Sequence, residues 1–127
     1  MTTVRDLMTS DLVIVGPDAT VQQAASGMFA SHTGSALVME GDRLLGIFTE
    51  RDIVRALSGT SDAGRSSSVG RGMTPDPQVI EPDATVGEAL DRMLDGGFRH
   101  LPVVEGGSVI GMVSMRDWAQ AASRPRV

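Results

Sequence analysis

Apolar residues recur with a helical period in two stretches of the chain. In the first they fall at i, i+3, i+4, i+7 and i+8, namely at Val21, Ala24, Ala25, Met28 and Phe29. The same spacing returns at Val86, Ala89, Leu90, Met93 and Leu94. This period places each set of side chains on one face of a helix. Each stretch therefore predicts a helix whose apolar face points into a core.

Shorter apolar runs predict strands around these helices. Val13 to Val15 forms a short run that ends at Gly16-Pro17. The predicted hairpin strands, with turns at Gly41-Asp42 and Gly106-Gly107, are 36–40, 43–48, 101–105 and 108–113. Two-residue turns rich in Gly and Asp suit the positive φ angles of tight hairpins. A final helix is expected to begin near Thr49 and again near Ser114. Each half of the chain then has the order strand, helix, strand, strand, helix.

The second half of the chain repeats the first with an offset of 65 residues. Residues 4–54 align with 69–119 without a gap, and 17 of the 51 positions are identical. The identities cluster in Met8-Thr9, Pro17 to Val21 and Arg51-Asp52, which return as Met73-Thr74, Pro82 to Val86 and Arg116-Asp117. One unit of about 50 residues buries too little apolar surface to be stable alone. We therefore expect two stacked copies with two related clefts at their junction.

Composition narrows the class of protein. The 127 residues suit one compact module, and with 41% hydrophobic residues but only three Phe and one Trp its core is expected to be aliphatic. The absence of Cys excludes disulfides and Cys-based metal sites and fits a reducing, cytoplasmic compartment. No signal peptide or membrane span is predicted. A net charge of −5 without a basic stripe disfavours nucleic acid as a partner.

The motif with chemical content runs from Gly46 to Asp52 and returns from Gly111 to Asp117. It lies where a predicted strand ends and a helix begins, and a helix N-terminus offers free N–H groups to phosphate. The hydroxyls of Thr49 and Ser114 can accept from the backbone and still donate outward. The two Asp carboxylates can accept from the hydroxyls of a ribose. The adjacent cations, Arg51 and Arg116, can offset the negative charge. These groups and an apolar wall together predict a nucleotide site.

The same residues have a purely structural interpretation. Thr49 with Asp52, and Ser114 with Asp117, have the spacing of a capping box, as do Thr20 with Gln23 and Thr85 with Glu88. The two glycines, Gly46 and Gly111, could kink a strand or allow a close approach to the backbone. A cap alone requires neither the repeated Arg-Asp pair nor these glycines, so both interpretations remain open.

In order, spacing and duplication, Pro-Asp-Ala-Thr-Val, the hairpin and Gly-x-x-Thr/Ser-x-Arg-Asp resemble the tandem CBS (cystathionine β-synthase) domain pair, or Bateman module, over residues 4–119. The resemblance implies an α/β (α+β) fold in which two β-α-β-β-α units pack sheet to sheet with pseudo-twofold symmetry. The module would span 1–127, with repeats at 4–57 and 69–122 and a flexible linker at 58–68.

The resemblance also implies ligands and residue roles. CBS pairs commonly bind adenosine-containing ligands, among them AMP, ADP, ATP, S-adenosylmethionine and dinucleotides such as NAD. The implied ribose and phosphate contacts are Thr49, Asp52, Ser114 and Asp117. Backbone near the first strand of each repeat would meet the adenine, which implicates Asp11, Leu12, Val13, Asp76, Pro77 and Gln78.

The two copies differ in basic residues. Arg99 and His100 precede the second hairpin, where the first copy has Gly34 and Ser35. Basic groups at such positions often contact phosphate in the family, so the two clefts are expected to differ in phosphate affinity. His32 falls opposite Gly97 at an expected helix end, which makes it a poor candidate for a ligand contact.

No enzyme is predicted, because the chain has no nucleophile with a paired base, no P-loop and no metal-binding cluster. We expect a regulatory module that requires no cofactor, binds adenosine-containing ligands and signals by a conformational or oligomeric change, with a regulated protein as partner. The alternative is an oligomerisation or interaction protein with vestigial clefts. A homodimer is expected from the apolar surface of the last helices, supplied by Ile53, Val54, Leu57, Trp118 and Ala122.

Overall fold

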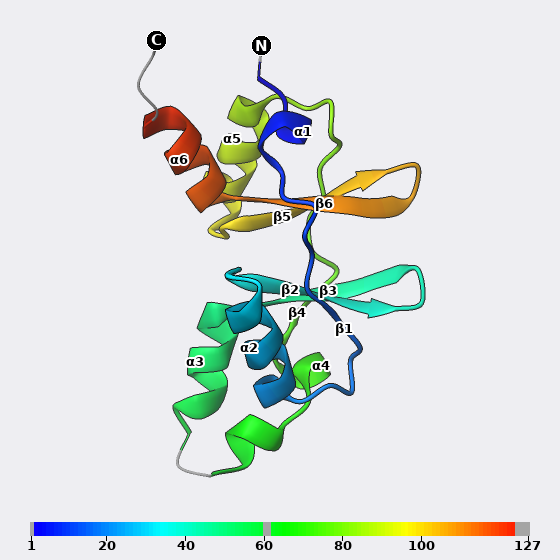
Figure 1. Ribbon diagram of the computed structural model, residues 1–127, viewed down its shortest axis with the longest axis vertical. Coiled ribbons are helices and arrows are strands. Elements are labelled where there is room, and N and C mark those ends of the chain that lie inside the picture. The colour runs from blue at the N-terminus through cyan, green and yellow to red at the C-terminus, as the bar shows by residue number, and fades with distance from the viewer. Residues whose placement is uncertain (1, 60–61, 124–127) are drawn as a thin grey trace. The chain divides into compact units, whose positions relative to one another are not determined.

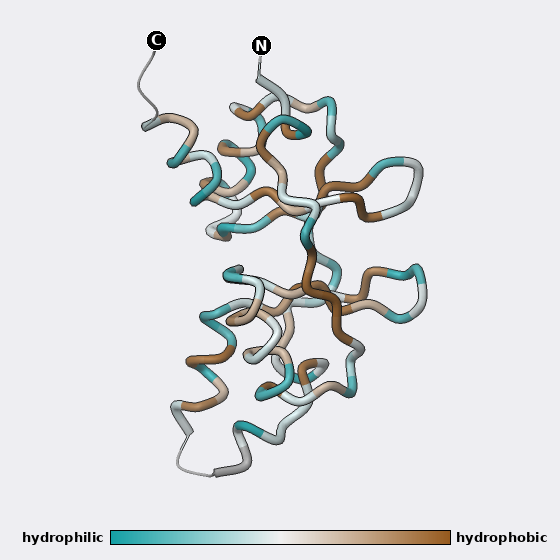
Figure 2. Tube along the Cα trace, viewed as in Figure 1, coloured by the Kyte–Doolittle hydropathy of each residue, from teal (hydrophilic) through white to brown (hydrophobic). Residues whose placement is uncertain are grey.

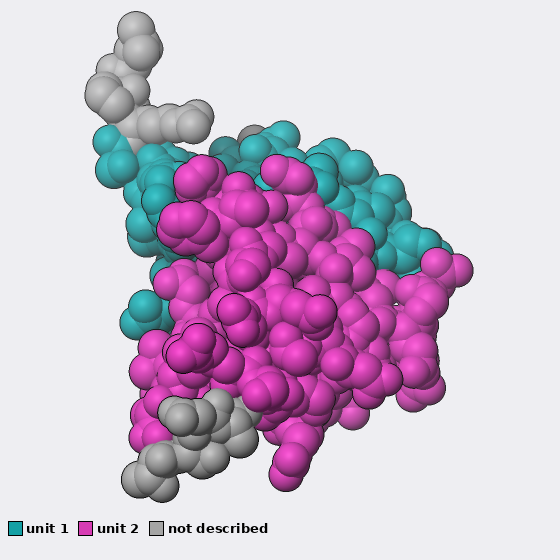
Figure 3. Space-filling model, turned by 60° about the horizontal axis from the view of Figure 1, so that its bottom comes forward, with its two compact units in different colours: residues 1–10, 78–127 teal, residues 11–77 magenta. Residues whose placement is uncertain are grey.

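The computed structural model describes residues 2–59 and 62–123. The chain forms two compact units, coloured separately in Figure 3. Unit 1 combines residues 1–10 with 78–127, and unit 2 comprises residues 11–77. Neither unit coincides with one sequence repeat. The leading segment of each repeat belongs to the unit that is built mainly from the other repeat.

Unit 2 is a four-stranded sheet with helices on one side (Figure 1). Its sheet has the order β1-β2-β3-β4, in which β1 is parallel to β2 and the other pairs are antiparallel. The strands are β1 (Ile14–Val15), β2 (Ser35–Glu40), β3 (Arg43–Thr49) and β4 (Thr74–Pro75). The helices are α2 (Val21–Ala30), α3 (Glu50–Leu57), the 3-10 helix η1 (Asp62–Ser66) and α4 (Val69–Gly72).

Unit 1 has the same arrangement of a hairpin and helices, but single bridges take the place of the edge strands. The hairpin of β5 (His100–Glu105) and β6 (Ser108–Ser114) carries one parallel bridge, from Ile80 to Val103, and one antiparallel bridge, from Thr9 to Met112. Its helices are α1 (Val4–Leu7), α5 (Val86–Gly96) and α6 (Met115–Ser123). The leading strand of the second repeat is thus reduced to a bridge.

Both hairpins, the two periodic helices, the two final helices and the mixed α/β class are confirmed, whereas the strand predicted to lead the second repeat is only a bridge at Ile80. Apolar residues concentrate along the strands, whereas the hairpin turns are polar (Figure 2). Both glycines of the Gly106-Gly107 turn have positive φ, as does Gly41 in the other turn. The short elements α1, α4 and β4 were not predicted. Within the described residues, no helix combines the length and apolar character that crossing a membrane requires.

The segment 58–68, predicted to be a flexible linker, contains a helix. η1 packs closely against α3, because a Cβ added to Gly64 would lie 2.3 Å from the carbonyl oxygen of Ala56. The Ser67 hydroxyl also donates to the Gly64 carbonyl over 2.7 Å. The small residue Gly64 therefore serves for close packing, a role that composition alone does not distinguish from flexibility.

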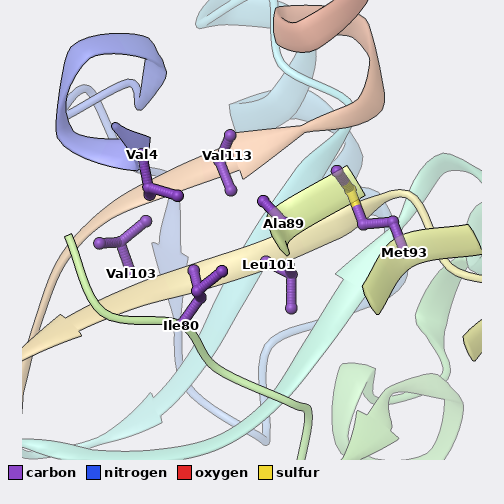
Figure 4. Close-up of a cluster of buried hydrophobic side chains, with 7 residues drawn as sticks. All are labelled: Val4, Ile80, Ala89, Met93, Leu101, Val103 and Val113. Carbon is purple, nitrogen blue, oxygen red and sulfur yellow. The ribbon is translucent and has the colours of Figure 1, made fainter. Parts of the chain in front are cut away.

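Each unit has an aliphatic core that includes the first residue of a short helix. In unit 1 the completely buried Val4 packs with Val103 and Val113 (Figure 4). In unit 2 the equivalent Val69 is also fully buried and joins a core that includes Phe48. The leading segments of the repeats therefore complete the cores of the opposite units.

The inward orientation predicted for the periodic helix faces is only partly correct. Val21, Ala24 and Met28 are buried, as are Ala89 and Met93. Phe29 is 82% exposed, however, and its equivalent Leu94 is 63% exposed. At about 100° per residue, position i+8 lies roughly 80° from position i and falls outside the narrow buried arc. The prediction was wrong for Phe29 and Leu94 because it treated that arc as too wide.

Helix caps follow the predicted spacing with one difference. Thr20 and Gln23 form the full capping box. Thr85 accepts from the Glu88 amide over 3.1 Å, but the described structure contains only this half of the second box. His32 has a φ of 54° just beyond the end of α2, which matches the φ of 71° at the equivalent Gly97. His32 therefore occupies the left-handed position that follows the end of α2.

Candidate functional site

In unit 2, Thr49 and Asp52 form a reciprocal cap at the start of α3. Asp52 Oδ2 accepts from the Thr49 amide over 2.9 Å and from the Thr49 hydroxyl over 3.1 Å. The Asp52 amide in turn donates to Thr49 Oγ1 over 3.4 Å. Asp52 is only 6% exposed, and its Oδ1 lies 3.5 Å from Nη1 of Arg55. We call this arrangement the Thr49 corner.

In unit 1, Ser114 and Asp117 occupy the same positions at the start of α6. Asp117 Oδ2 accepts from the Ser114 amide over 2.9 Å, and the Asp117 amide donates to Ser114 Oγ over 3.1 Å. Asp117 is half-buried rather than buried. The structural interpretation of the motif as a capping box is therefore confirmed at both positions. We call this arrangement the Ser114 corner.

Strand register places the predicted basic residues beside the Ser114 corner. His100 is the cross-strand partner of Ser114, and the Arg99 carbonyl accepts from the Met115 amide over 2.8 Å. The Arg99 side chain is exposed. At the Thr49 corner the partner of Thr49 is Ser35, which is 3% exposed, and the Gly34 carbonyl accepts from Glu50. Only the Ser114 corner therefore gathers basic side chains from both its strand and the residue before it.

Of the residues predicted near the first strands, only some approach these corners. The Val13 carbonyl accepts from the Leu37 amide over 2.8 Å. Because β1 runs parallel to β2, Asp11 and Leu12 enter unit 2 at the end of the sheet where β2 begins, which is also the end of Thr49. Arg51 and Arg116 are exposed on their helices.

The second predicted set is divided between the units. Asp76 and Pro77 belong to unit 2, whereas Gln78 belongs to unit 1. The Asp76 amide donates to the Leu45 carbonyl over 3.1 Å, toward the hairpin end of β3 and away from Thr49. Asp76 also has a φ of 46°, in the left-handed region. Asp76 and Pro77 therefore lie away from the Thr49 corner. Because Ile80 pairs in parallel with Val103, Gln78 enters unit 1 at the end of the hairpin where His100 pairs with Ser114.

The two motif glycines permit a close approach of protein backbone. A Cβ added to Gly46 would lie 2.5 Å from Met73 Sδ and 2.7 Å from the Thr74 carbonyl oxygen. A Cβ added to Gly111 would lie 2.6 Å from Met8 Sδ and 3.0 Å from the Thr9 carbonyl oxygen. The segments Met8-Thr9 and Met73-Thr74, identical in the two repeats, thus lie against these glycines at the sheet edges, with Thr9 in a single bridge and Thr74 in β4. This role accounts for the glycines without a ligand.

Sequence reasoning missed Arg55, which makes the ion pair with Asp52. Residue 120, at the equivalent place in the second repeat, is Gln. The change from Arg to Gln at matched positions was the available signal. Among the described residues, no group of three His, Asp or Glu side chains is placed to hold a metal ion.

Comparison with known proteins identifies the family. The sequence-family model of the CBS domain matches residues 4–59 and again residues 67–124. This chain belongs to the CBS domain family. CBS pairs are in general regulatory modules without catalytic chemistry. The two matches also support the tandem arrangement of the repeats.

Similar CBS proteins come from several sources. The CBS domain-containing protein YhcV of Bacillus subtilis is 32% identical over 127 residues, a match covering 94% of this chain and 84% of YhcV. The crystal structure of the CBS-domain protein ATU1752 of Agrobacterium tumefaciens is 36% identical, with a TM-score of 0.88 and coverage of 95% and 99%. CBSX2, solved in complex with AMP, is 27% identical, with a TM-score of 0.78 and coverage of 96% of both chains.

Proposed function

We propose that this CBS pair is a non-catalytic regulatory module of the cytoplasm that binds adenosine-containing ligands at the Thr49 and Ser114 corners. The observation that carries the proposal is the duplicated hydroxyl and carboxylate pair at the N-termini of α3 and α6. The AMP complex of the related CBSX2 supports the ligand class. AMP, ADP, ATP, S-adenosylmethionine and NAD are the candidate ligands, and none is required as a cofactor.

The chemistry of each corner suits the sugar of a nucleoside. A carboxylate has two oxygens and about four acceptor positions, so a capping Asp retains acceptor capacity beyond its bonds to the backbone. Two adjacent ribose hydroxyls can donate to that remaining capacity. The cations Arg51, Arg99, and Arg116 are exposed at or near the corners and can attract phosphate.

Such a module signals through conformation. A ligand that binds one arrangement of the two units more tightly than another shifts the population toward that arrangement. The expected output is therefore a change in how the units, a second copy or a regulated protein partner fit together.

A second candidate function is an interaction protein with vestigial ligand sites. The observation that favours it is that both capping boxes are satisfied internally, as a purely structural role requires. The two functions predict different results when an adenylate is added. The proposed module gives saturable heat on titration with AMP, ATP, S-adenosylmethionine or NAD, and ligand at 100 times its Kd stabilises the fold by about 2.7 kcal/mol. A vestigial module shows neither effect with any of them.

Arg99→Ala is expected to weaken binding in proportion to ligand phosphate charge. Arg99 is an exposed cation beside the Ser114 corner, so its removal should cost more affinity for ATP than for AMP and almost none for adenosine. Calorimetric titration with the three ligands measures the trend. Arg43→Ala is a charge-matched control, because Arg43 is an exposed cation at the hairpin end of β3 in unit 2. An equal loss for adenosine and ATP would show that Arg99 does not contact phosphate.

A homodimer formed through the helical faces is the proposed assembly. Val54 and Leu57 on α3 are 66% and 52% exposed, Ala122 is exposed, and Ile53 and Trp118 are half-buried. Light scattering should report about twice the chain mass of 13.3 kDa. The double variant Val54→Ser with Leu57→Ser should shift the protein toward monomer, because it removes apolar area from the interface. Ile14→Ser, which changes an exposed residue of β1, serves as the control. A wild-type mass of one chain would contradict the proposal.

A further inference from the structure

The two corners have the same motif but differ in the hydrogen bonds and ion pairs that their side chains make. At the Thr49 corner the cap hydroxyl donates to Asp52 Oδ2, and Asp52 Oδ1 lies 3.5 Å from the Arg55 guanidinium. At the Ser114 corner the hydroxyl accepts from the Asp117 amide but, within the described residues, donates to no group. Among the described residues, no cation forms an ion pair with Asp117, whose Oδ2 accepts from the Ser114 amide. The donor and acceptor that a ribose would use are thus engaged at one corner and open at the other.

Burial follows the same division. The side chain of Asp52 is 7% exposed, whereas Asp117 is half-buried. The side chain of Arg55 is itself 70% exposed, so solvent can hydrate its charge when it leaves Asp52. Release of Asp52 by Arg55 therefore costs little beyond the ion pair itself. Gln120, at the equivalent position of α6, carries no charge that could hold Asp117 in the same way.

We infer that Arg55 makes the corners unequal, so that an adenosine-containing ligand occupies the Ser114 corner first and the Thr49 corner only after Arg55 has released Asp52. The inference rests on the proposed function. It assigns to Arg55 the role of a residue that determines which corner a ligand occupies first. The order of occupancy follows from competition. A ribose hydroxyl must replace Arg55 at Asp52 Oδ1, whereas among residues 2–59 and 62–123 no cation pairs with Asp117.

The expected size of this effect is modest. The Arg55 partner of this ion pair is well solvated, so the pair should contribute up to about 1 kcal/mol, as surface pairs do. Release of Asp52 should then strengthen binding at the Thr49 corner by about two- to fivefold. The open hydroxyl of Ser114 and the neighbouring Arg99 add to the difference between the corners, which should produce two separate binding steps in the wild type.

A reciprocal exchange of the two residues tests the inference. Asp117→Asn is expected to remove the tighter of the two steps in a calorimetric titration with AMP. In that background, Arg55→Gln should strengthen the remaining step by about two- to fivefold, for adenosine as well as for AMP. In the otherwise wild-type chain, Gln120→Arg should weaken the tighter step by a similar factor, because the new cation can pair with Asp117 as Arg55 does with Asp52.

Three outcomes would overturn the inference, and one would instead overturn the proposed function. Two steps of equal affinity would contradict unequal corners. A weaker remaining step for AMP but not for adenosine after Arg55→Gln would make Arg55 a phosphate ligand. No change in either member of the exchange would show that the ion pair does not govern occupancy. If the wild type binds neither adenosine nor any of the adenylates, the proposed function itself is wrong.

Discussion

Gly46→Ala is expected to destabilise the protein by about 2–3 kcal/mol, the upper range for overpacking a tight site. The new methyl group would lie 2.5 Å from Met73 Sδ and 2.7 Å from the Thr74 carbonyl oxygen. The methionine can rotate away, but the carbonyl belongs to β4, which pairs with β3 at this point. Relief therefore requires β4 to separate from the sheet. The melting temperature of a chain of this length should fall by roughly 4 °C per kcal/mol.

Matched glycines make this prediction specific. Gly111→Ala should cost less than Gly46→Ala, because the equivalent carbonyl oxygen of Thr9 would lie 3.0 Å from the new carbon. Adding Met8→Ala to Gly111→Ala should restore part of the loss. Gly16→Ala meets no atom within 4 Å and should change stability by less than about 1 kcal/mol. Urea denaturation of the four variants measures the order, and equal stability of the Gly46 and Gly16 variants would refute the edge-strand contact.

Asp117→Ala is expected to weaken adenylate binding at the Ser114 corner at least tenfold. Up to two hydrogen bonds from the ribose to a charged acceptor are lost, and each contributes roughly 1.5–3 kcal/mol. Asp52→Ala should have a comparable effect at the Thr49 corner. The loss of fold stability should be smaller, because the removal of a helix cap costs about 1 kcal/mol. Calorimetry gives the affinity and thermal denaturation gives the stability.

Two controls separate the charge of Asp117 from its capping role. Asp117→Asn keeps an oxygen that can accept from the Ser114 amide but removes the charged acceptor, so the cap should survive while binding falls. Asp91→Ala removes the same charge from an exposed position on α5 and should leave affinity within about twofold of wild type, as expected for a screened surface charge. If the Asp→Ala variants melt at a lower temperature and the wild type binds no ligand, the Asp residues act as caps only.

Local patterns were sufficient for the helices and hairpins. A helix face repeats within two turns, and a tight turn depends on a few residues such as Gly106 and Gly107, so both can be inferred from neighbouring positions. The capping partners Thr49 and Asp52 were found for the same reason. The exposure of Phe29 could not be inferred this way, because it depends on how closely α2 packs on the sheet.

The candidate site was predicted in part. The hydroxyl and the carboxylate were identified because the motif is duplicated, and Arg99 and His100 because the copies differ there. Strand register then pairs His100 with Ser114 in unit 1. The internal state of each corner was not predictable. The direction of a hydroxyl proton and the partner of a carboxylate depend on side-chain positions, which is why the Asp52 and Arg55 pair emerged only in three dimensions.

By itself, the sequence determined that two copies of a β-α-β-β-α unit exist, where their elements begin, and which residues can do chemistry. Only the tertiary structure decided that the leading segments are exchanged, with Val4 in the core of the second repeat and Val69 in the core of the first. The physical reason is that the residues shared by the two segments, a Val and a Met-Thr pair, do not by themselves assign a segment to a core. The residues that differ matter only in three dimensions, where Gly70 and Gly72 fit closely against Pro17 and Phe48. The choice between them is made by chain geometry and long-range packing, which no local pattern records.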